Sequence, residues 1–279
     1  MADPHDLATL DQAKKYLSPT ISGQAADQQI SQLLTAVSKG IAFYCSRIFV
    51  SQTITELRHG NSRESMRTKN YPIIQVQSVQ INGMTVNQST GVTSPGWVND
   101  YEYLYIRGSV PGGAGGLYSG CRFPKGVLNV SIIYSFGFLT PGQIVIQNLP
   151  SWQNGVHYTV PQQILQGGYI YTCISPGISG ASTPTFTTTL GAEITDSNVV
   201  WQNAGAWAAP PANAFDLPEQ LTTAACIQTA YMYAMRPRIG DSSTGEAQQR
   251  VTYIMRDWHP SVKDKIDPFK AVVPIGNYS

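Results

Sequence analysis

One long amphipathic stretch, residues 27–49, constrains the fold of this chain more than any other feature. Its apolar side chains recur every three or four residues, the spacing that places them on one face of a helix. They are Ile30, Leu33, Leu34, Val37, Ile41, Tyr44, Cys45 and Ile48. Asp27 is the predicted N-cap, because its carboxylate can accept hydrogen bonds from the first free backbone amides. The apolar face needs cover, so other segments of the chain must pack against it.

Helical patterns able to cover this face stand at both ends of the chain. Near the N-terminus, residues 9–17 begin with Thr9 and Gln12, a pair that predicts a capping box. The C-terminal helical patterns span residues 217–235, 244–258 and 262–269. Small apolar residues in the first of these suit close packing between helices. We therefore predict that the N- and C-terminal helices form one bundle.

Between these helical ends the apolar period changes to two, which indicates β-strands. The predicted strands cover residues 54–58, 73–81, 84–86, 101–107 and 127–138. Asn82-Gly83 joins two of them, and both positions of that hairpin turn require positive φ. A polar, basic loop is predicted from Arg58 to Lys69. The glycine-rich stretch 108–120 is interpreted as a hairpin tip, because it lacks the G-K-[ST] ending of a phosphate-binding loop.

Composition argues against several classes of function. Lys and Arg number 18 against 17 Asp and Glu, so there is no global attraction to nucleic acid or membranes. No secretion signal is visible, and no apolar run approaches the ~20 residues that a membrane span needs. The four cysteines are far apart, which favours free buried thiols in a reducing compartment. We expect a soluble protein made in a cytoplasm.

Catalytic and cofactor chemistry find no support in the sequence. The histidines, His5, His59, His157 and His259, are scattered. Neither G-x-S-x-G nor H-E-x-x-H occurs, and no pair of carboxylates can be placed together. We therefore expect no enzyme activity, no metal site and no cofactor.

Residues 149–209 differ in composition from the rest of the chain. No Lys or Arg occurs between Lys125 and Arg236. Aromatic residues among short β-type runs indicate a small all-β unit with an aromatic core. The predicted fold class is α+β: a bundle of N- and C-terminal helices, an antiparallel β part between them, and an inserted small all-β domain. The predicted domains are residues 1–148 with 210–279, and residues 149–209.

Several stretches resemble the head–tail connector (adaptor or head-completion) proteins of tailed bacteriophages. They are Leu7–Leu17, Tyr44–Phe49, Pro72–Gly83, Leu217–Leu221, Tyr231–Arg236 and Trp258–Phe269. The resemblance implies a structural virion protein, assembled in the host cytoplasm, that forms a ring, usually dodecameric, beneath the portal. Such a ring extends the DNA channel and offers a docking platform to tail or stopper proteins. DNA passes through the lumen without sequence-specific binding, and no membrane, cofactor or catalysis is implied.

The inserted unit resembles small β modules of phage structural proteins that are similar to carbohydrate-binding modules. The resemblance rests on Trp152, Tyr158, Gly168–Cys173, Ser179-Gly180, Thr183-Pro184, Asp196 and Val200–Gly205. If exposed, Trp152 or Trp201 can stack on sugar rings; the alternative is that both rings belong to the core of the unit. A carbohydrate-binding or decoration protein is therefore the second hypothesis.

Two further groups of residues are candidate partner contacts. The basic candidates for contact with a partner or with DNA in the channel are Arg58, Arg63, Arg67, Lys69, Arg236 and Arg238. The alternative for the basic loop is a solvated loop without a partner. The C-terminal tail is a candidate docking arm, with apolar contacts from Val273, Ile275 and Tyr278.

Overall fold

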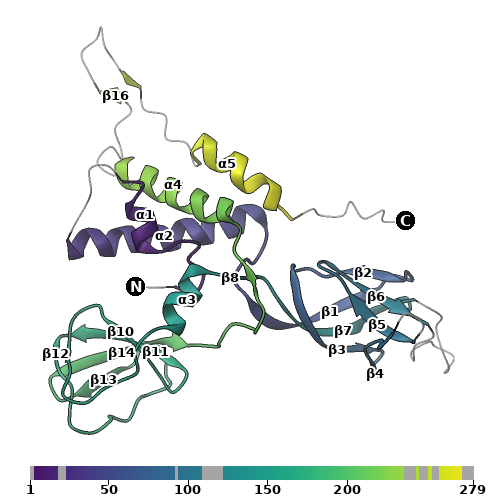
Figure 1. Cartoon of the computed structure of the whole chain (residues 1–279), viewed down its shortest axis with the longest axis horizontal. Helices are drawn as coiled ribbons and strands as arrows, with labels where there is room; N and C mark the ends of the chain where they lie inside the picture. Colours follow the sequence, from purple (N-terminus) through teal and green to yellow (C-terminus); the bar gives the residue numbers. More distant parts are fainter. Residues whose placement is uncertain are drawn as a thin grey trace. The chain divides into compact units, whose positions relative to one another are not determined.

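The computed structural model describes residues 3–17, 23–91, 94–108, 122–235, 243–244, 251–252 and 258–271. These residues form helices and mainly antiparallel sheets, which confirms the α+β class (Figure 1). The chain divides into two compact units. Unit 1 comprises Met1–Arg47, Thr140–Ala209 and Leu217–Ser279, and unit 2 comprises Ile48–Leu139 and Pro210–Asp216. The predicted boundaries of an inserted domain at 149–209 stay a prediction.

The first two helices belong to unit 1. Helix α1 spans Leu10–Lys14, and Thr9 and Gln12 form the predicted capping box. Helix α2 spans Gln24–Cys45 with Gly23 as its N-cap, so the predicted N-cap Asp27 is wrong. Residues 24–26, Gln-Ala-Ala, are good helix formers and extend the helix by one turn. Asp27 instead forms an ion pair with Lys14 at 2.7 Å, which joins the two helices.

Helices from the C-terminal part of the chain pack on these two. Helix α4, Glu219–Met235, contacts α1 and α2, and helix α5, Pro260–Ile266, contacts α4. A short 3-10 helix, Asp267–Phe269, follows α5. The buried face of α4 carries Leu221, Ala224, Ala225, Cys226, Gln228 and Thr229. Its small residues allow the close helix packing that the sequence predicts.

The predicted helix 244–258 is wrong where the structure describes it. Strand β16, Ser243–Thr244, pairs antiparallel with strand β17, Val251–Thr252. The β-branched Thr and Val at these positions favour a strand over a helix. No described residue in this range is helical. Sequence analysis also missed helix α3, Pro141–Gln147, which has a capping box between Thr140 and Gln143 and proline in its first turn.

After α3 the chain forms a small antiparallel sheet, still within unit 1. Its strand order is β10-β11-β14-β13. The strands are β10 Gln163–Gln166, β11 Tyr169–Ser175, β13 Glu193–Asp196 and β14 Val199–Ala206, with a separate pair of β9 His157–Tyr158 and β12 Gly177–Ile178. Tyr158, Tyr171 and Trp201 are buried in its core, and Trp152 and Phe186 pack against them. The predicted aromatic core is therefore confirmed.

Unit 2 is built from β-strands around a second core. A four-stranded sheet has the order β1-β7-β3-β4, and a three-stranded sheet has the order β2-β6-β5. The strands are β1 Gln52–Gly60, β2 Ser65–Arg67, β3 Ile73–Ile81, β4 Met84–Val86, β5 Gly96–Asn99, β6 Tyr103–Arg107 and β7 Gly126–Phe136. Strand β8, Phe138–Leu139, pairs in parallel with β15, Phe215–Asp216. Inward side chains such as Trp97, Leu104 and Ile132 form the core.

The structure confirms one prediction for the β part and corrects another. Asn82 and Gly83 have φ of 51° and 79°, so the predicted hairpin between β3 and β4 is confirmed. The predicted loop from Arg58 to Lys69 is wrong in part, because β1 continues to Gly60 and β2 pairs with β6. The glycine-rich stretch 108–120 lies outside the described residues beyond Gly108.

Candidate functional site

The outer face of the four-stranded sheet in unit 2 is an uncharged surface. Strand pairing aligns its side chains in three cross-strand rows. The rows are Thr53–Ser135–Gln75, Thr55–Ile133–Ser78 and Leu57–Ser131–Gln80–Thr85. None of these side chains is charged, although the inner face of the same sheet fills the core. We call this surface the uncharged sheet face.

Several properties make the uncharged sheet face suited to burial against a partner. The hydroxyls of Thr53 and Ser135 hydrogen-bond to each other at 2.7 Å, so both have a partner within the protein. Leu57 is 55% exposed, and Val127 and Leu128, near the start of β7, are 81% and 52% exposed. Covering this face removes apolar area from water without desolvating an ion. A protein partner therefore fits it better than a nucleic acid does.

The predicted basic residues are divided between paired and exposed side chains. Arg58 lies 3.3 Å from the Glu56 carboxylate, and Arg67 lies 2.9 Å from the carboxylate of Glu102. The Arg67 guanidinium also lies 4.8 Å from the centre of the Tyr71 ring. Arg63 and Lys69, in contrast, have exposed side chains. Of the predicted basic residues in this segment, Arg63 and Lys69 are therefore the most available to a partner.

A buried carboxylate fixes the backbone beneath this basic segment. Glu56 is 7% exposed and accepts hydrogen bonds from the backbone N–H of Lys69, at 3.1 Å, and from the Tyr134 hydroxyl. Burial, together with the neighbouring Glu56 charge, raises the pKa of Tyr134 well above its ordinary value. The tyrosine therefore stays a neutral donor to the carboxylate. Sequence analysis did not single out this pair, because Glu56 and Tyr134 lie on different strands.

The candidate surface aromatics of the inserted segment need a correction. Trp201 is fully buried, so it is not a surface aromatic: strand β14 turns Val199, Trp201 and Asn203 toward the core. Trp152 is half-buried, and its indole N–H donates to the Asp196 carboxylate at 2.7 Å. This bond holds the ring against the core. The structure thus supports the core interpretation of these rings over sugar stacking.

The last described residues are anchored to the C-terminal end of α2. The Tyr44 hydroxyl donates to the Asp267 carboxylate at 2.9 Å, and the Lys270 ammonium lies 4.1 Å from the centre of the Tyr44 ring. The backbone N–H of Ala271 donates to the Cys45 carbonyl at 2.8 Å. The tail therefore leaves the body at a fixed point. The candidate arm residues Val273, Ile275 and Tyr278 lie outside the described residues, as do Arg236 and Arg238.

The described residues also bear on metal binding and on thiol chemistry. Among them, no group of three or more His, Cys, Asp or Glu side chains is arranged to hold a metal ion. Cys45, Cys173 and Cys226 are free and buried. Burial raises the pKa of Cys45 and of Cys226 to about 11, so both thiols stay protonated at neutral pH. None of the helices in the described part of the chain is long and apolar enough to span a membrane.

Part of this chain is similar to a known family of proteins. Its residues 6–103 match the model of the head completion protein family, which confirms the resemblance seen in the sequence. That segment includes α1, α2 and the strands from β1 to β5.

No protein of curated function matches the sequence. A chain from a structure described as the neck of an empty GTA particle, computed with C6 symmetry, is 14% identical. The alignment covers 100% of this chain and 96% of that chain with a TM-score of 0.43. A TM-score of this size does not define a common fold.

Proposed function

We propose that the protein is a head–tail adaptor that forms a closed ring, expected to be dodecameric, under the portal. The ring extends the DNA channel and provides the docking platform for tail or stopper proteins. The observation that carries this proposal is the head completion family match over residues 6–103. Assembly takes place in the host cytoplasm, and packaged DNA passes through the lumen without sequence-specific binding. No specific observation favours carbohydrate binding as a second function.

In this proposal the uncharged sheet face is a contact between neighbouring copies. A ring forms when a patch on one copy binds a different patch on the next and the rotation closes. A permanent contact of this kind favours surfaces that bury apolar area without leaving charged groups buried and unpaired. The exposed Leu57 and the paired hydroxyls of Thr53 and Ser135 meet this requirement.

Two other groups of residues receive roles in this proposal. Arg63 and Lys69 contact either DNA in the channel or an acidic surface of the portal or tail protein. Phosphate contacts weaken as salt concentration rises, so Arg63→Glu with Lys69→Glu should reduce the salt-dependent part of partner or DNA binding and leave folding intact. If the double variant binds DNA and the portal or tail protein as the wild type does, this role is contradicted.

The tail beyond Ala271 docks on a neighbouring copy through Val273, Ile275 and Tyr278.

Electron microscopy and mass measurement of the purified full chain, alone and mixed with its portal, test the ring. We expect a closed ring of defined copy number in at least one of the two samples, because some adaptors assemble only on the portal. A version truncated after Ala271 should remain folded by circular dichroism but assemble less completely. A monomer that neither assembles nor binds the portal would overturn the proposal, and normal assembly of the truncated chain would overturn the role of the tail.

A further inference from the structure

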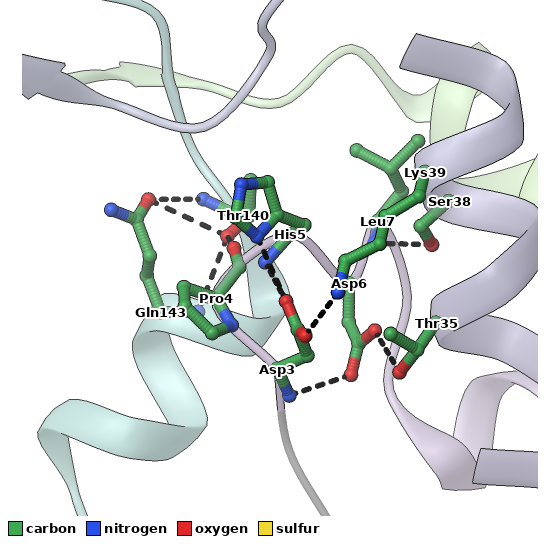
Figure 2. Close-up of polar contacts among 10 residues, drawn as sticks. All are labelled: Asp3, Pro4, His5, Asp6, Leu7, Thr35, Ser38, Lys39, Thr140 and Gln143. Carbon is green, nitrogen blue, oxygen red and sulfur yellow. Dashed lines mark hydrogen bonds and ion pairs between the residues drawn. The ribbon is translucent and has the colours of Figure 1, made fainter. Parts of the chain in front are cut away.

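The segment before α1, residues 3–7, lies between two helices of unit 1 (Figure 2). On the α2 side, the Thr35 hydroxyl donates to the Asp6 carboxylate at 2.7 Å. The backbone N–H of Leu7 donates to the Ser38 hydroxyl at 3.1 Å, and Lys39 forms an ion pair with Asp3 at 2.8 Å. These contacts fix the segment to the middle of α2.

The same segment is bonded to the first turn of α3. The Thr140 hydroxyl donates to the Pro4 carbonyl at 2.6 Å, and the Gly142 N–H donates to the Asp6 carbonyl at 3.2 Å. A Cβ atom at Gly142 would lie 1.9 Å from the Asp3 carbonyl oxygen, so only glycine allows this approach. Residues 3–7 therefore connect α2 to α3, two helices far apart in sequence.

The Asp6 carboxylate at the centre of this connection is buried, and none of the described Lys, Arg or His side chains forms an ion pair with it. It is 4% exposed and accepts hydrogen bonds from Thr35 and from the backbone N–H of Asp3 at 2.9 Å. Lys39 and His5, the nearby side chains that can carry positive charge, both contact Asp3. The α3 side contributes the neutral Thr140 and Gln143.

Burial raises the pKa of Asp6 from 3.8 to about 6, and the negative charge of Asp3 adds to the increase, while the hydrogen bonds from the Asp3 backbone N–H and the Thr35 hydroxyl oppose it. A proton is therefore held more tightly when the segment is docked than when it is released. The docked state gains stability that is fully present below pH 3.8 and is lost as the pH rises through about 6. The Thr35 hydroxyl can donate or accept, so either form of Asp6 keeps this contact.

We propose that residues 3–7 form a clasp between α2 and α3 that holds more tightly in mildly acidic than in neutral solution. The clasp acts on the helix that precedes the small sheet, whose first strand pair begins at His157. At neutral pH the ionised Asp6 weakens the clasp, so that it opens more often than in acid. This inference concerns the single chain and does not depend on ring assembly.

Hydrogen–deuterium exchange of the α3 amides in the full chain at pH 5 and pH 8, corrected for intrinsic exchange rates, tests the clasp. A pKa that differs by about two units between docked and released Asp6 predicts about tenfold more opening at pH 8 than at pH 5. Asp6→Asn cannot ionise and should protect α3 equally at both pH values. Asp11→Asn, a change at an exposed carboxylate on α1, should keep the wild-type pH dependence.

The wild-type measurement alone decides the acid dependence, even if a variant fails to fold. Equal protection of α3 at the two pH values in the wild type would overturn the proposal, and so would an unchanged pH dependence in Asp6→Asn. Gly142→Ala, which pushes the Asp3 carbonyl away, should raise α3 exchange at both pH values. Normal α3 protection in that variant would show that the segment does not hold the helix.

Discussion

At the scale of single residues, Asp196 organises the core of the sheet that follows α3. Its carboxylate accepts hydrogen bonds from the Trp152 indole at 2.7 Å, the Gly180 backbone N–H at 2.9 Å and the Trp201 indole at 3.4 Å. The side chain is 4% exposed, so water cannot replace these partners. One acidic residue therefore fixes the positions of two tryptophans and a turn.

This arrangement predicts a large effect for Asp196→Asn. The amide keeps one acceptor oxygen and presents N–H groups toward indole donors, so at least one buried donor loses its partner. We expect the free energy of unfolding to fall by about 2 kcal/mol. Denaturant unfolding of the full chain, followed by tryptophan fluorescence, measures the change. Glu193→Gln, an exposed neighbour in the same strand, should have little effect, and equal stability of both variants would contradict this role for Asp196.

At the scale of elements, α4 depends on the small size of its buried residues. Ala224 and Ala225 are fully buried on the helix, which packs on α1 and α2. Small side chains let helix axes approach closely, and a close-packed core has no room for added volume.

A larger side chain should therefore destabilise this contact. We expect Ala225→Leu to lower the free energy of unfolding by about 1–3 kcal/mol, because overpacking forces the helices apart. Ala234→Leu, at an exposed position of the same helix, is the matched control and should be nearly neutral. Thermal or denaturant unfolding measures both. If Ala225→Leu left the free energy of unfolding unchanged, the contact of α4 with α1 and α2 would have space for the larger side chain.

At the scale of the whole molecule, the uncharged sheet face is the surface that we propose for contact between copies. Thr55 lies in the central row of this face, opposite Ile133. We expect Thr55→Lys to leave the fold intact and to reduce ring formation at least tenfold, because a buried unpaired ammonium strongly disfavours the contact. Native mass measurement of the variant, alone and with the portal, shows how much ring forms. Thr90→Lys, on an exposed loop of the same unit, should assemble normally. Normal assembly of Thr55→Lys would show that this face is free in the ring.

Local interactions were readable from the sequence. The capping box of Thr9 and Gln12, the strand Ile73–Ile81 and the Asn82-Gly83 turn each depend on residues only a few positions apart. The same signals were present for α3, where Thr140, Pro141 and Gln143 form a capping box with proline in the first turn. The capping box made this helix predictable, but a helix of seven residues is too short to show a clear apolar period.

Tertiary structure alone decided the features that join distant parts of the chain. The alternation in Val199–Ala206 shows that Trp201 shares a face with Val199, but only the assembled sheet shows that this face is the buried one. Nothing local predicts that Asp6 meets Thr35, or that Glu56 meets Tyr134. Apart from α3 and the predicted helix 244–258, the sequence by itself determined the helix and strand types and the aromatic core, because these depend on side-chain period and size. Contacts between elements depend on how the chain folds back on itself, and they decided where the clasp, the buried carboxylates and the uncharged sheet face lie.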